Sequence, residues 1–194
     1  MVDFVTLAQQ CAPDVHPTTL AAVVRTESGF NPYAIGVVAG RLERQPKSLG
    51  EAVATAENLR SNGWNASFGL GQVNLHNLAR YGLTTTTVFD PCQNLRAAAA
   101  ILSEAFVRAR KNEPDEQKAL RAAISMYYSG NAVTGFTHGY VQKVVGNAGI
   151  EVDTGGPTKA IAVLGNGGAN NKPKAAVRPP ERKVVERVAS NRVE

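Results

Sequence analysis

The fold of this chain is constrained most by a succession of helix-length segments, each bounded by residues that begin or end helices. Ser48 and Asp115 are favourable N-cap residues, Pro91 suits the first turn of a helix, and Gly29 can end a helix in the left-handed conformation. We find no convincing alternation of apolar and polar residues that would indicate strands, and no internal repeat. The sequence therefore predicts an all-α protein. Its helices are expected over residues 3–11, 18–28, 49–61, 74–81, 91–111, 115–128 and 136–147.

A change of composition after Gly149 divides the chain into two regions. Residues 1–149 have the length and apolar content of one compact helical domain. Residues 153–180 are rich in Gly, Asn, Pro, Lys and Ala, and cannot bury enough apolar surface to offset the entropy of ordering. A short amphipathic helix over 181–193 would be marginal by itself. We therefore expect residues 150–194 to form a flexible linker and a disordered basic tail.

Charge and hydropathy exclude several classes of function. Residues 150–194 carry eight Lys and Arg against five Asp and Glu, whereas residues 1–149 carry 13 against 11. This near-neutral body lacks the basic face of nucleic-acid-binding domains, so no nucleic-acid partner is expected. No apolar run approaches the roughly 20 residues of a membrane span, and no basic region followed by a long apolar run marks a signal peptide. The three histidines have no metal-ligand spacing, so neither a metal nor another cofactor is expected.

The two cysteines, Cys11 and Cys92, are too far apart in sequence for a CxxC redox or zinc motif. Two buried thiols are expected in a reducing compartment, and one structural disulfide in an oxidising compartment. Both residues are placed at predicted helix ends, where a disulfide would tie the N-terminal segment to the body of the domain. In an exported protein, we therefore expect Cys11 and Cys92 to be joined.

The predicted second helix places a carboxylic acid on its apolar face. The residues at i, i+3, i+4 and i+7 of this face are Leu20, Val23, Val24 and Glu27. Partial burial would disfavour ionisation of Glu27, and so would the negative end of the helix dipole. A glutamic acid kept protonated near neutral pH can act as the general acid in cleavage of a glycosidic bond. On spacing alone, a partly buried Glu paired with Arg or backbone donors is the simpler interpretation.

Four sequence blocks favour the catalytic interpretation of Glu27 over the structural one. They read ESGFNP at residues 27–32, SFGLGQVN at 67–74, ISMYYSGN at 124–131 and GYVQKV at 139–144. In this order they resemble the soluble lytic transglycosylase family, which is related to goose-type lysozyme. Any one block is a weak signal, but four in register are a specific one. The resemblance implies a lysozyme-like helical domain in which Glu27 is the single catalytic acid.

The resemblance also implies a set of substrate-binding residues. Ser67 and Gln72 would line the sugar cleft on a turn where Gly69 and Gly71, which lack side chains, let a glycan approach the backbone. Two tyrosines would project into the cleft, Tyr127 and Tyr140. Tyr127 also continues the helical stripe of Leu120 and Ile124, so a position in the core is an equal alternative for it. Asn74 is expected to cap a helix rather than to act in catalysis.

Two features depart from the common family pattern. Residues 35–66 form a longer insertion between the first two blocks, and this resembles the branch associated with type IV secretion and conjugation systems. Tyr128 stands where the family usually has Asn, so a substrate contact of that Asn does not carry over. No second carboxylate stands near the motifs; the candidates lie in the insertion or in loops, at Glu43, Glu51, Glu57 and Asp90.

Because Glu27 is the single carboxyl group near the motifs, the resemblance implies substrate-assisted cleavage between N-acetylmuramic acid and N-acetylglucosamine. The product would carry a 1,6-anhydro end, and no water would be consumed. The expected setting is the periplasm, where a monomer cuts peptidoglycan glycan strands for a secretion apparatus and its tail can contact secretion-system subunits. A muramidase that hydrolyses the same bond is one alternative. A non-catalytic wall-binding assembly subunit and a cytoplasmic helical interaction protein are two others.

Overall fold

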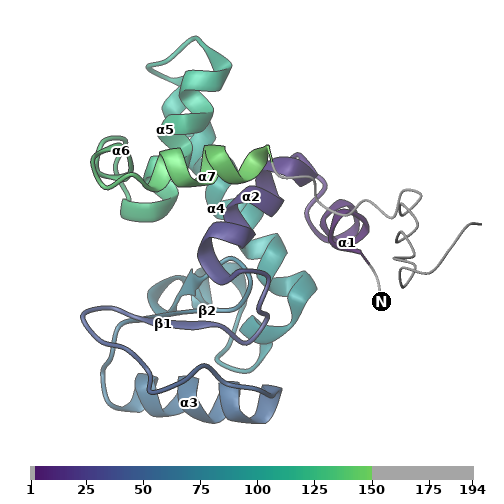
Figure 1. Ribbon diagram of the computed structural model, residues 1–194, viewed down its shortest axis with the longest axis vertical. Coiled ribbons are helices and arrows are strands. Elements are labelled where there is room, and N and C mark those ends of the chain that lie inside the picture. Colours follow the sequence, from purple (N-terminus) through teal and green to yellow (C-terminus); the bar gives the residue numbers. More distant parts are fainter. Residues whose placement is uncertain (1–2, 150–194) are drawn as a thin grey trace, which may run out of the picture. The chain divides into compact units, whose positions relative to one another are not determined.

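The computed structural model describes residues 3–149, which are mostly helical (Figure 1), so the predicted helical class is confirmed. The expected linker and tail over 150–194, with the short helix considered at 181–193, lie outside the described residues. Among the described residues, no helix combines the length and the apolar character needed to cross a bilayer. The α-helices are α1 (Phe4–Cys11), α2 (Pro17–Ser28), α3 (Leu49–Ser61), α4 (Pro91–Arg110), α5 (Glu116–Ser129), α6 (Thr134–Thr137) and α7 (Tyr140–Ala148).

Helix ends follow the capping residues of the sequence. Asp90 accepts a hydrogen bond from the backbone N–H of Gln93 at 2.8 Å, and Asp115 accepts one from Lys118 at the same distance. These side chains satisfy amide donors that have no partner within the helix. Gly29 follows α2 with a φ of 59°, the left-handed conformation that glycine adopts without strain. The catalytic candidate Glu27 therefore lies in the last turn of α2.

The segment expected to be one helix over 136–147 consists of two helices, so that expectation is wrong. Gly139 takes a φ of 72° between α6 and α7, and this left-handed residue interrupts the helical path. Tyr140 becomes the first residue of α7. Gly135 in α6 lies against α5, since a Cβ atom there would come within 2.6 Å of the Ser125 Cα atom.

A small antiparallel sheet was not predicted. Its strands are β1 (Ile35–Val37), β2 (Ala66–Phe68) and β3 (Val73–Asn74), in the order β1-β2-β3. Strands of two or three residues are too short to show an alternating pattern, which explains why the sequence did not reveal them. Three short 3-10 helices replace the helix expected after Asn74 and part of the following loop: η1 (Leu75–Asn77), η2 (Ala79–Tyr81) and η3 (Thr87–Phe89).

Two hydrophobic clusters form the interior. One lies among α1, α2, α4, α5 and α7, which with α6 we call the helical part. The other lies among α3, the three strands and the 3-10 helices, which we call the sheet part. Helix α4 contributes Leu95 and Leu102 to the first cluster and Ala97 to the second, so it belongs to both cores. In Figure 1, α3 lies below the sheet, at the end opposite α5, α6 and α7.

Cys11 and Cys92 form a disulfide with their Cα atoms 5.1 Å apart. This separation is within the range that a disulfide spans without backbone movement. The bond connects the last residue of α1 to the second residue of α4. It fastens the N-terminal helix to the helix that is shared by the two cores.

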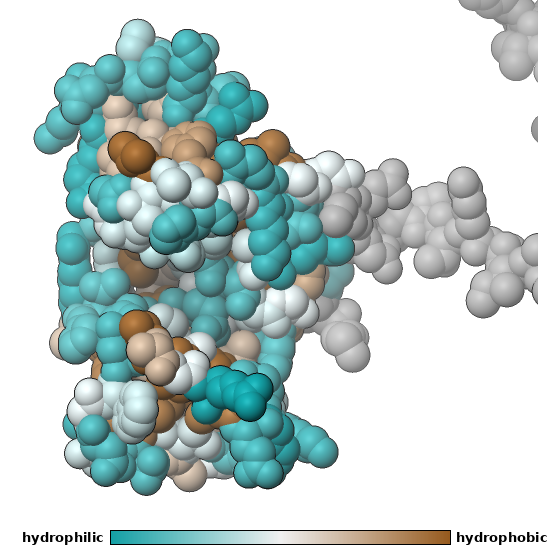
Figure 2. All heavy atoms as spheres, turned by 60° about the vertical axis from the view of Figure 1, so that its left-hand side comes forward, coloured by the Kyte–Doolittle hydropathy of each residue, from teal (hydrophilic) through white to brown (hydrophobic). Residues whose placement is uncertain are grey.

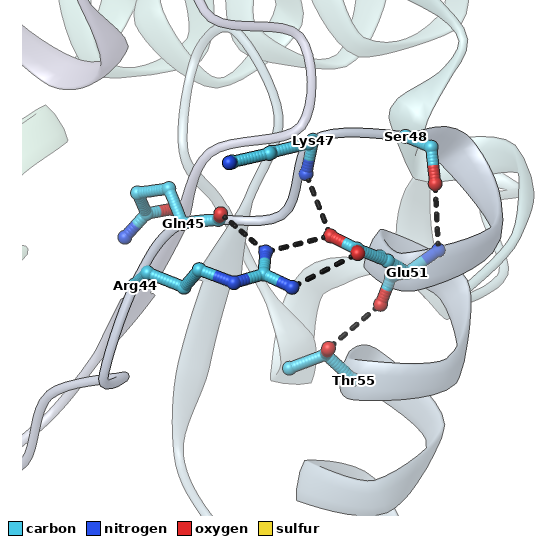
Figure 3. A network of polar contacts seen from close by, with 6 residues as sticks. All are labelled: Arg44, Gln45, Lys47, Ser48, Glu51 and Thr55. Atoms are coloured by element: carbon cyan, nitrogen blue, oxygen red, sulfur yellow. Dashed lines mark hydrogen bonds and ion pairs between the residues drawn. The ribbon is translucent and has the colours of Figure 1, made fainter.

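Polar contacts hold the insertion in place. The Arg44 guanidinium donates to both carboxylate oxygens of Glu51, at 2.8 and 2.9 Å, and the Lys47 backbone N–H donates to one of them at 2.8 Å (Figure 3). The Ser48 hydroxyl accepts from the Glu51 backbone N–H, which caps α3. These donors, Arg44 foremost, lower the pKa of Glu51 to about 2. The loop that precedes α3 is thereby fixed to the first turn of α3.

Candidate active site

A cleft of about 500 Å³ lies between the helical part and the sheet part. Figure 2 shows the surface hollowed between the two. Residues from α2, α4 and α5 line one side, and residues of the strands and the segments beside them line the other. The lining comprises Glu27, Gly36, Val37, Val38, Asn65, Ser67, Gln72, Asn74, Asn77, Ile101, Tyr127, Tyr128 and Ser129.

Glu27 is the only carboxyl group among the residues that line this cleft. The apolar residues of its helix face, Leu20, Val23 and Val24, are fully buried, and they anchor the turn that carries the carboxyl group. Burial raises the pKa of Glu27 because it disfavours the charged form, and a hydrogen bond from Tyr140 and the nearby charge of Lys143 oppose this shift only in part. The site therefore favours a protonated Glu27 over a wider pH range than an exposed glutamate has.

Tyr140 lies behind Glu27 rather than in the cleft lining. Its side chain is buried and its hydroxyl donates a hydrogen bond to Oε1 of Glu27. Burial raises the pKa of Tyr140 well above its usual range, so the phenol keeps its proton and remains a donor. Because Gly139 turns the chain immediately before it, Tyr140 reaches α2 from the first residue of α7.

Tyr127 combines the two positions that the sequence left open. It lines the cleft and also packs on the core of the helical part. Its hydroxyl donates to the carbonyl oxygen of Gly71 at 2.5 Å, which links α5 to the glycine-rich turn. Burial raises the pKa of Tyr127 well above its usual range, and the charge of Glu27 adds to this. Tyr127 therefore holds the two sides of the cleft in register.

The expectation that Gly69 and Gly71 open the turn to a glycan is wrong. A Cβ atom on Gly69 would come within 2.3 Å of the Asn94 Nδ2 atom, and one on Gly71 within 2.5 Å of the Ala98 Cβ atom. Both glycines are buried against α4. The missing side chains make room for the protein's own helix, and the turn reaches the cleft through Gln72 instead.

Gln72 lines the cleft, and its side-chain amide supports the turn. It adopts a φ of 50°, and its Nε2 atom donates to the carbonyl oxygens of Ala34 at 3.0 Å and Gly69 at 2.9 Å. Non-glycine residues rarely adopt this conformation, and here two hydrogen bonds compensate for it. Gln72 is thus both a cleft residue and the link between the turn and the segment before β1.

Ser67 belongs to a group of polar side chains on the sheet side of the cleft. Asn74 caps η1, as predicted, because its Oδ1 atom accepts from the His76 backbone N–H at 3.0 Å. Its Nδ2 atom donates to Asn65 at 2.8 Å and to the Ser67 hydroxyl at 3.2 Å. The sequence did not identify Asn65 and Asn74 as cleft residues, since an isolated Asn beside a short strand carries no periodic signal.

Three of the other acidic side chains considered from the sequence, those of Glu51, Glu57 and Asp90, bind partners away from the cleft. Glu51 pairs with Arg44, and Glu57 pairs with Arg60 and accepts a hydrogen bond from Thr85. None of the four candidates, Glu43, Glu51, Glu57 and Asp90, lines the cleft. A two-carboxylate mechanism across this cleft therefore has no second group among the residues that line it.

Comparison with known proteins finds a matching family and similar proteins. Residues 4–146 match the family described as the transglycosylase SLT domain. The type IV secretion system protein virB1 of Brucella suis is 54% identical over 170 residues, which cover 84% of this chain and 69% of that protein. The protein virB1 of Agrobacterium fabrum is 34% identical over 142 residues, covering 73% of this chain and 58% of that protein. No solved structure gives a significant match.

The family match spans most of the chain and includes Glu27, the residues that line the cleft and most of α7. The chain therefore belongs to the transglycosylase SLT family and is a lytic transglycosylase. The family and the enzyme class predicted from the four sequence blocks are both confirmed.

Proposed function

We propose that the protein cleaves the β-1,4 bond between N-acetylmuramic acid and N-acetylglucosamine of peptidoglycan and leaves a 1,6-anhydro end. The observation that carries the proposal is a single carboxyl group in the cleft, with its pKa raised by burial and one oxygen bound by Tyr140. One group has to act first as an acid and then as a base. A raised pKa suits both steps, because it brings the two protonation states closer in energy at neutral pH than they are in an exposed glutamate.

In the first step, protonated Glu27 gives its proton to the glycosidic oxygen as the bond from this oxygen to C1 of the muramoyl residue breaks. Tyr140 donates to Oε1, so the acidic proton lies on Oε2 and the two protons do not compete. No second carboxylate is available in the cleft to stabilise the positive charge that develops. The N-acetyl group of the substrate takes this part, the substrate-assisted form of glycoside cleavage.

In the second step, the Glu27 carboxylate accepts the proton of the muramoyl C6 hydroxyl, and the oxygen of that group bonds to C1. Glu27 regains its proton, the leaving sugar has received one, and no water enters the balance. The Tyr140 hydrogen bond stabilises the carboxylate between the two steps. Charge-assisted hydrogen bonds of this kind are the stronger ones in proteins.

We further propose that this activity opens the cell wall locally for a type IV secretion apparatus in the periplasm. The support is the similarity to relatives named as type IV secretion proteins, which extends over 84% of the chain in the case of the Brucella suis protein. The Cys11–Cys92 disulfide supports an oxidising compartment. We also propose that residues 150–194 contact subunits of such an apparatus.

Mass spectrometry of the muropeptides released from purified sacculi tests the proposal. The expected products carry anhydro ends, which are lighter than hydrolysed ends by the mass of one water. Hydrolysed ends would show a muramidase instead. If the purified chain binds sacculi and releases nothing, it is a wall-binding subunit without activity, and the proposed reaction is wrong.

A further inference from the structure

Tyr128, the residue that departs from the family pattern, is packed directly against the tyrosine that holds Glu27. It lies in the last turn of α5, lines the cleft and is 46% exposed. Its ring stacks on the Tyr140 ring with centroids 4.5 Å apart and planes 17° from parallel. One ring face of Tyr128 is therefore covered by the protein and is not available to a sugar.

Two further contacts of Tyr128 come from His138, in the turn between α6 and α7. The His138 ring packs edge-on with its centroid 6.0 Å from that of Tyr128, and the Tyr128 hydroxyl lies 3.4 Å from His138 Nδ1. His138 is the residue before Gly139, where the chain turns into Tyr140. Tyr128 thus contacts both ends of the short segment that brings Tyr140 to Glu27.

A stacked ring restricts the ring that it covers. The Tyr140 hydroxyl is useful to Glu27 only while its ring stays in one plane, because hydrogen bonds weaken steeply when they lose alignment. Tyr140 stands at the first residue of α7, directly after Gly139, with its ring buried against the core of the helical part. The flat face of Tyr128 limits its rotation, and offset stacking is a favourable arrangement for such pairs. Asn, the usual family residue at this position, has no ring to do this.

We propose that Tyr128 is a positioning residue, which acts through Tyr140 to hold the Glu27 carboxyl group in the orientation that proton transfer requires. Where the family usually has Asn, this chain has Tyr128, which forms a stacked pair with Tyr140. The inference rests on the proposed function, since it concerns the same carboxyl group. It differs from a sugar-binding role, which would act on substrate affinity and would leave the carboxyl group unaffected.

The test compares Tyr128→Phe, Tyr128→Asn and Tyr128→Leu by kcat, KM and the pH dependence of kcat on solubilised glycan strands. Tyr128→Phe keeps the stack and should retain nearly full activity. Tyr128→Asn and Tyr128→Leu remove it and should lower kcat by roughly 3- to 10-fold, the effect of losing one aromatic pair. KM should stay within about twofold. Phe136→Leu, an exposed aromatic of α6 outside the cleft, is the matched control and should leave kcat unchanged.

The pH profile separates positioning from general structural support. Tyr140 and Lys143 on α7 lower the pKa of Glu27, and the charge of Glu27 raises the pKa of Tyr127 on α5. The Tyr140 bond lowers the pKa of Glu27, so loosening it should move the alkaline limb of kcat to higher pH. Tyr128→Asn should shift this limb in the same direction as Tyr140→Phe, and adding it to Tyr140→Phe should have no further effect.

Several results would overturn the inference while leaving the proposed function intact. They are an unchanged kcat in Tyr128→Asn, a rise of KM with kcat unchanged, and full additivity of Tyr128→Asn with Tyr140→Phe. A lowered melting temperature with no movement of the alkaline limb would likewise show a purely structural role. If the unmodified protein releases no anhydro products, the proposed function fails first, and the inference falls with it.

Discussion

Glu27 and the polar wall opposite it are held by different means. Glu27 stands on a helix whose apolar face is fully buried, and a second helix, α7, supplies the tyrosine that binds it. The polar wall, which consists of Asn65, Ser67 and Asn74, belongs to the sheet part. The strands there have two or three residues and are not stable without further contacts. The helical part therefore holds Glu27 by packing, and the sheet part adds a further source of order to a hydrophobic cluster of its own.

Side-chain amides supply that order. Gln45 pairs with both backbone groups of Ile35, accepting from its N–H at 2.8 Å and donating to its carbonyl at 3.0 Å, as a neighbouring strand would. Asn94, fully buried on α4, accepts from the Gly71 N–H at 2.7 Å and donates to the carbonyl oxygens of Phe68 and Val88. Glu27, the proposed acid, thus stands on regular structure, while the sheet side of the cleft depends on single polar side chains.

Glu27→Gln should have the largest effect and should change the chemistry without changing either part of the fold. The amide keeps the shape of the carboxyl group but can neither give nor take the proton, and general acid–base catalysis contributes about 10²–10⁴-fold. Because one group serves both steps, we expect a loss at the upper end of this range or beyond it. Release of anhydro muropeptides by the purified variant is the measurement, and a rate within a few-fold of the unmodified protein would remove Glu27 from the mechanism.

The stability of this variant sharpens the same prediction. The folded-state pKa of Glu27 is raised, so its stabilising contribution is complete below the unfolded pKa and is lost as pH rises through the folded pKa. Glu27→Gln does not ionise, so near neutral pH its melting temperature should equal or exceed that of the unmodified protein. A variant that melts earlier at neutral pH would contradict this.

The elements that could be predicted from the sequence lie mainly in the helical part. Those that could not be predicted lie mainly in the sheet part. Helices of three or more turns have periodic apolar faces and capping residues, so α2, α3, α4 and α5 were found nearly to the residue. The strands and the amide contacts of Gln45 and Asn94 join residues distant in sequence, and no local pattern encodes them. The break at Gly139 was missed because a glycine inside an apolar pattern can also be tolerated within a helix.

The site shows the same limit. The spacing of the second helix and the family blocks together pointed to Glu27, Ser67, Gln72 and Tyr127, and all four line one cleft. The contact between Tyr140 and Glu27 could not be derived from spacing, because it depends on where Gly139 turns the chain. Tyr128 was noticed only as a substitution, and its packing on Tyr140 follows from the arrangement of α5 and α7.

Removal of the disulfide tests whether packing alone holds the helical part. The Cys11–Cys92 bond joins residues 81 positions apart, and replacing both with Ser should lower the free energy of unfolding by about 2–4 kcal/mol. Activity at low temperature should persist, since neither residue lines the cleft. Denaturant unfolding with and without reductant measures this. Non-reducing mass spectrometry of protein from the periplasm should show no free thiol, and two alkylatable cysteines there would contradict the bond.

Tyr140→Phe should have a smaller effect on the reaction than Glu27→Gln. It removes one hydrogen bond to a carboxyl group, worth roughly 1.5–3 kcal/mol when the group is charged, so kcat should fall about 10- to 100-fold. The bond lowers the pKa of Glu27, and its loss should move the alkaline limb of the kcat profile to higher pH. Tyr127→Phe is the matched comparison, since its hydroxyl binds Gly71 rather than Glu27. Tyr127→Phe should reduce stability and leave the alkaline limb of kcat nearly in place. The opposite pattern would show that Tyr127, rather than Tyr140, acts on Glu27.

The smallest effect is expected in the sheet part, at the exposed pair of Arg44 and Glu51 shown in Figure 3. The folded-state pKa of Glu51 is lowered to about 2, below its usual value of 4.5. Its stabilising contribution is therefore present above pH 4.5 and is lost as pH falls toward 2. Glu51→Gln should lower the melting temperature slightly at neutral pH, and the difference should vanish near pH 2 and diminish in high salt. Glu43→Gln, in the same loop, changes a side chain that forms no ion pair within residues 3–149 and is the matched control for the loss of this pair. If the two variants behave alike at every pH, the loop before α3 is held by its backbone contacts rather than by this carboxylate.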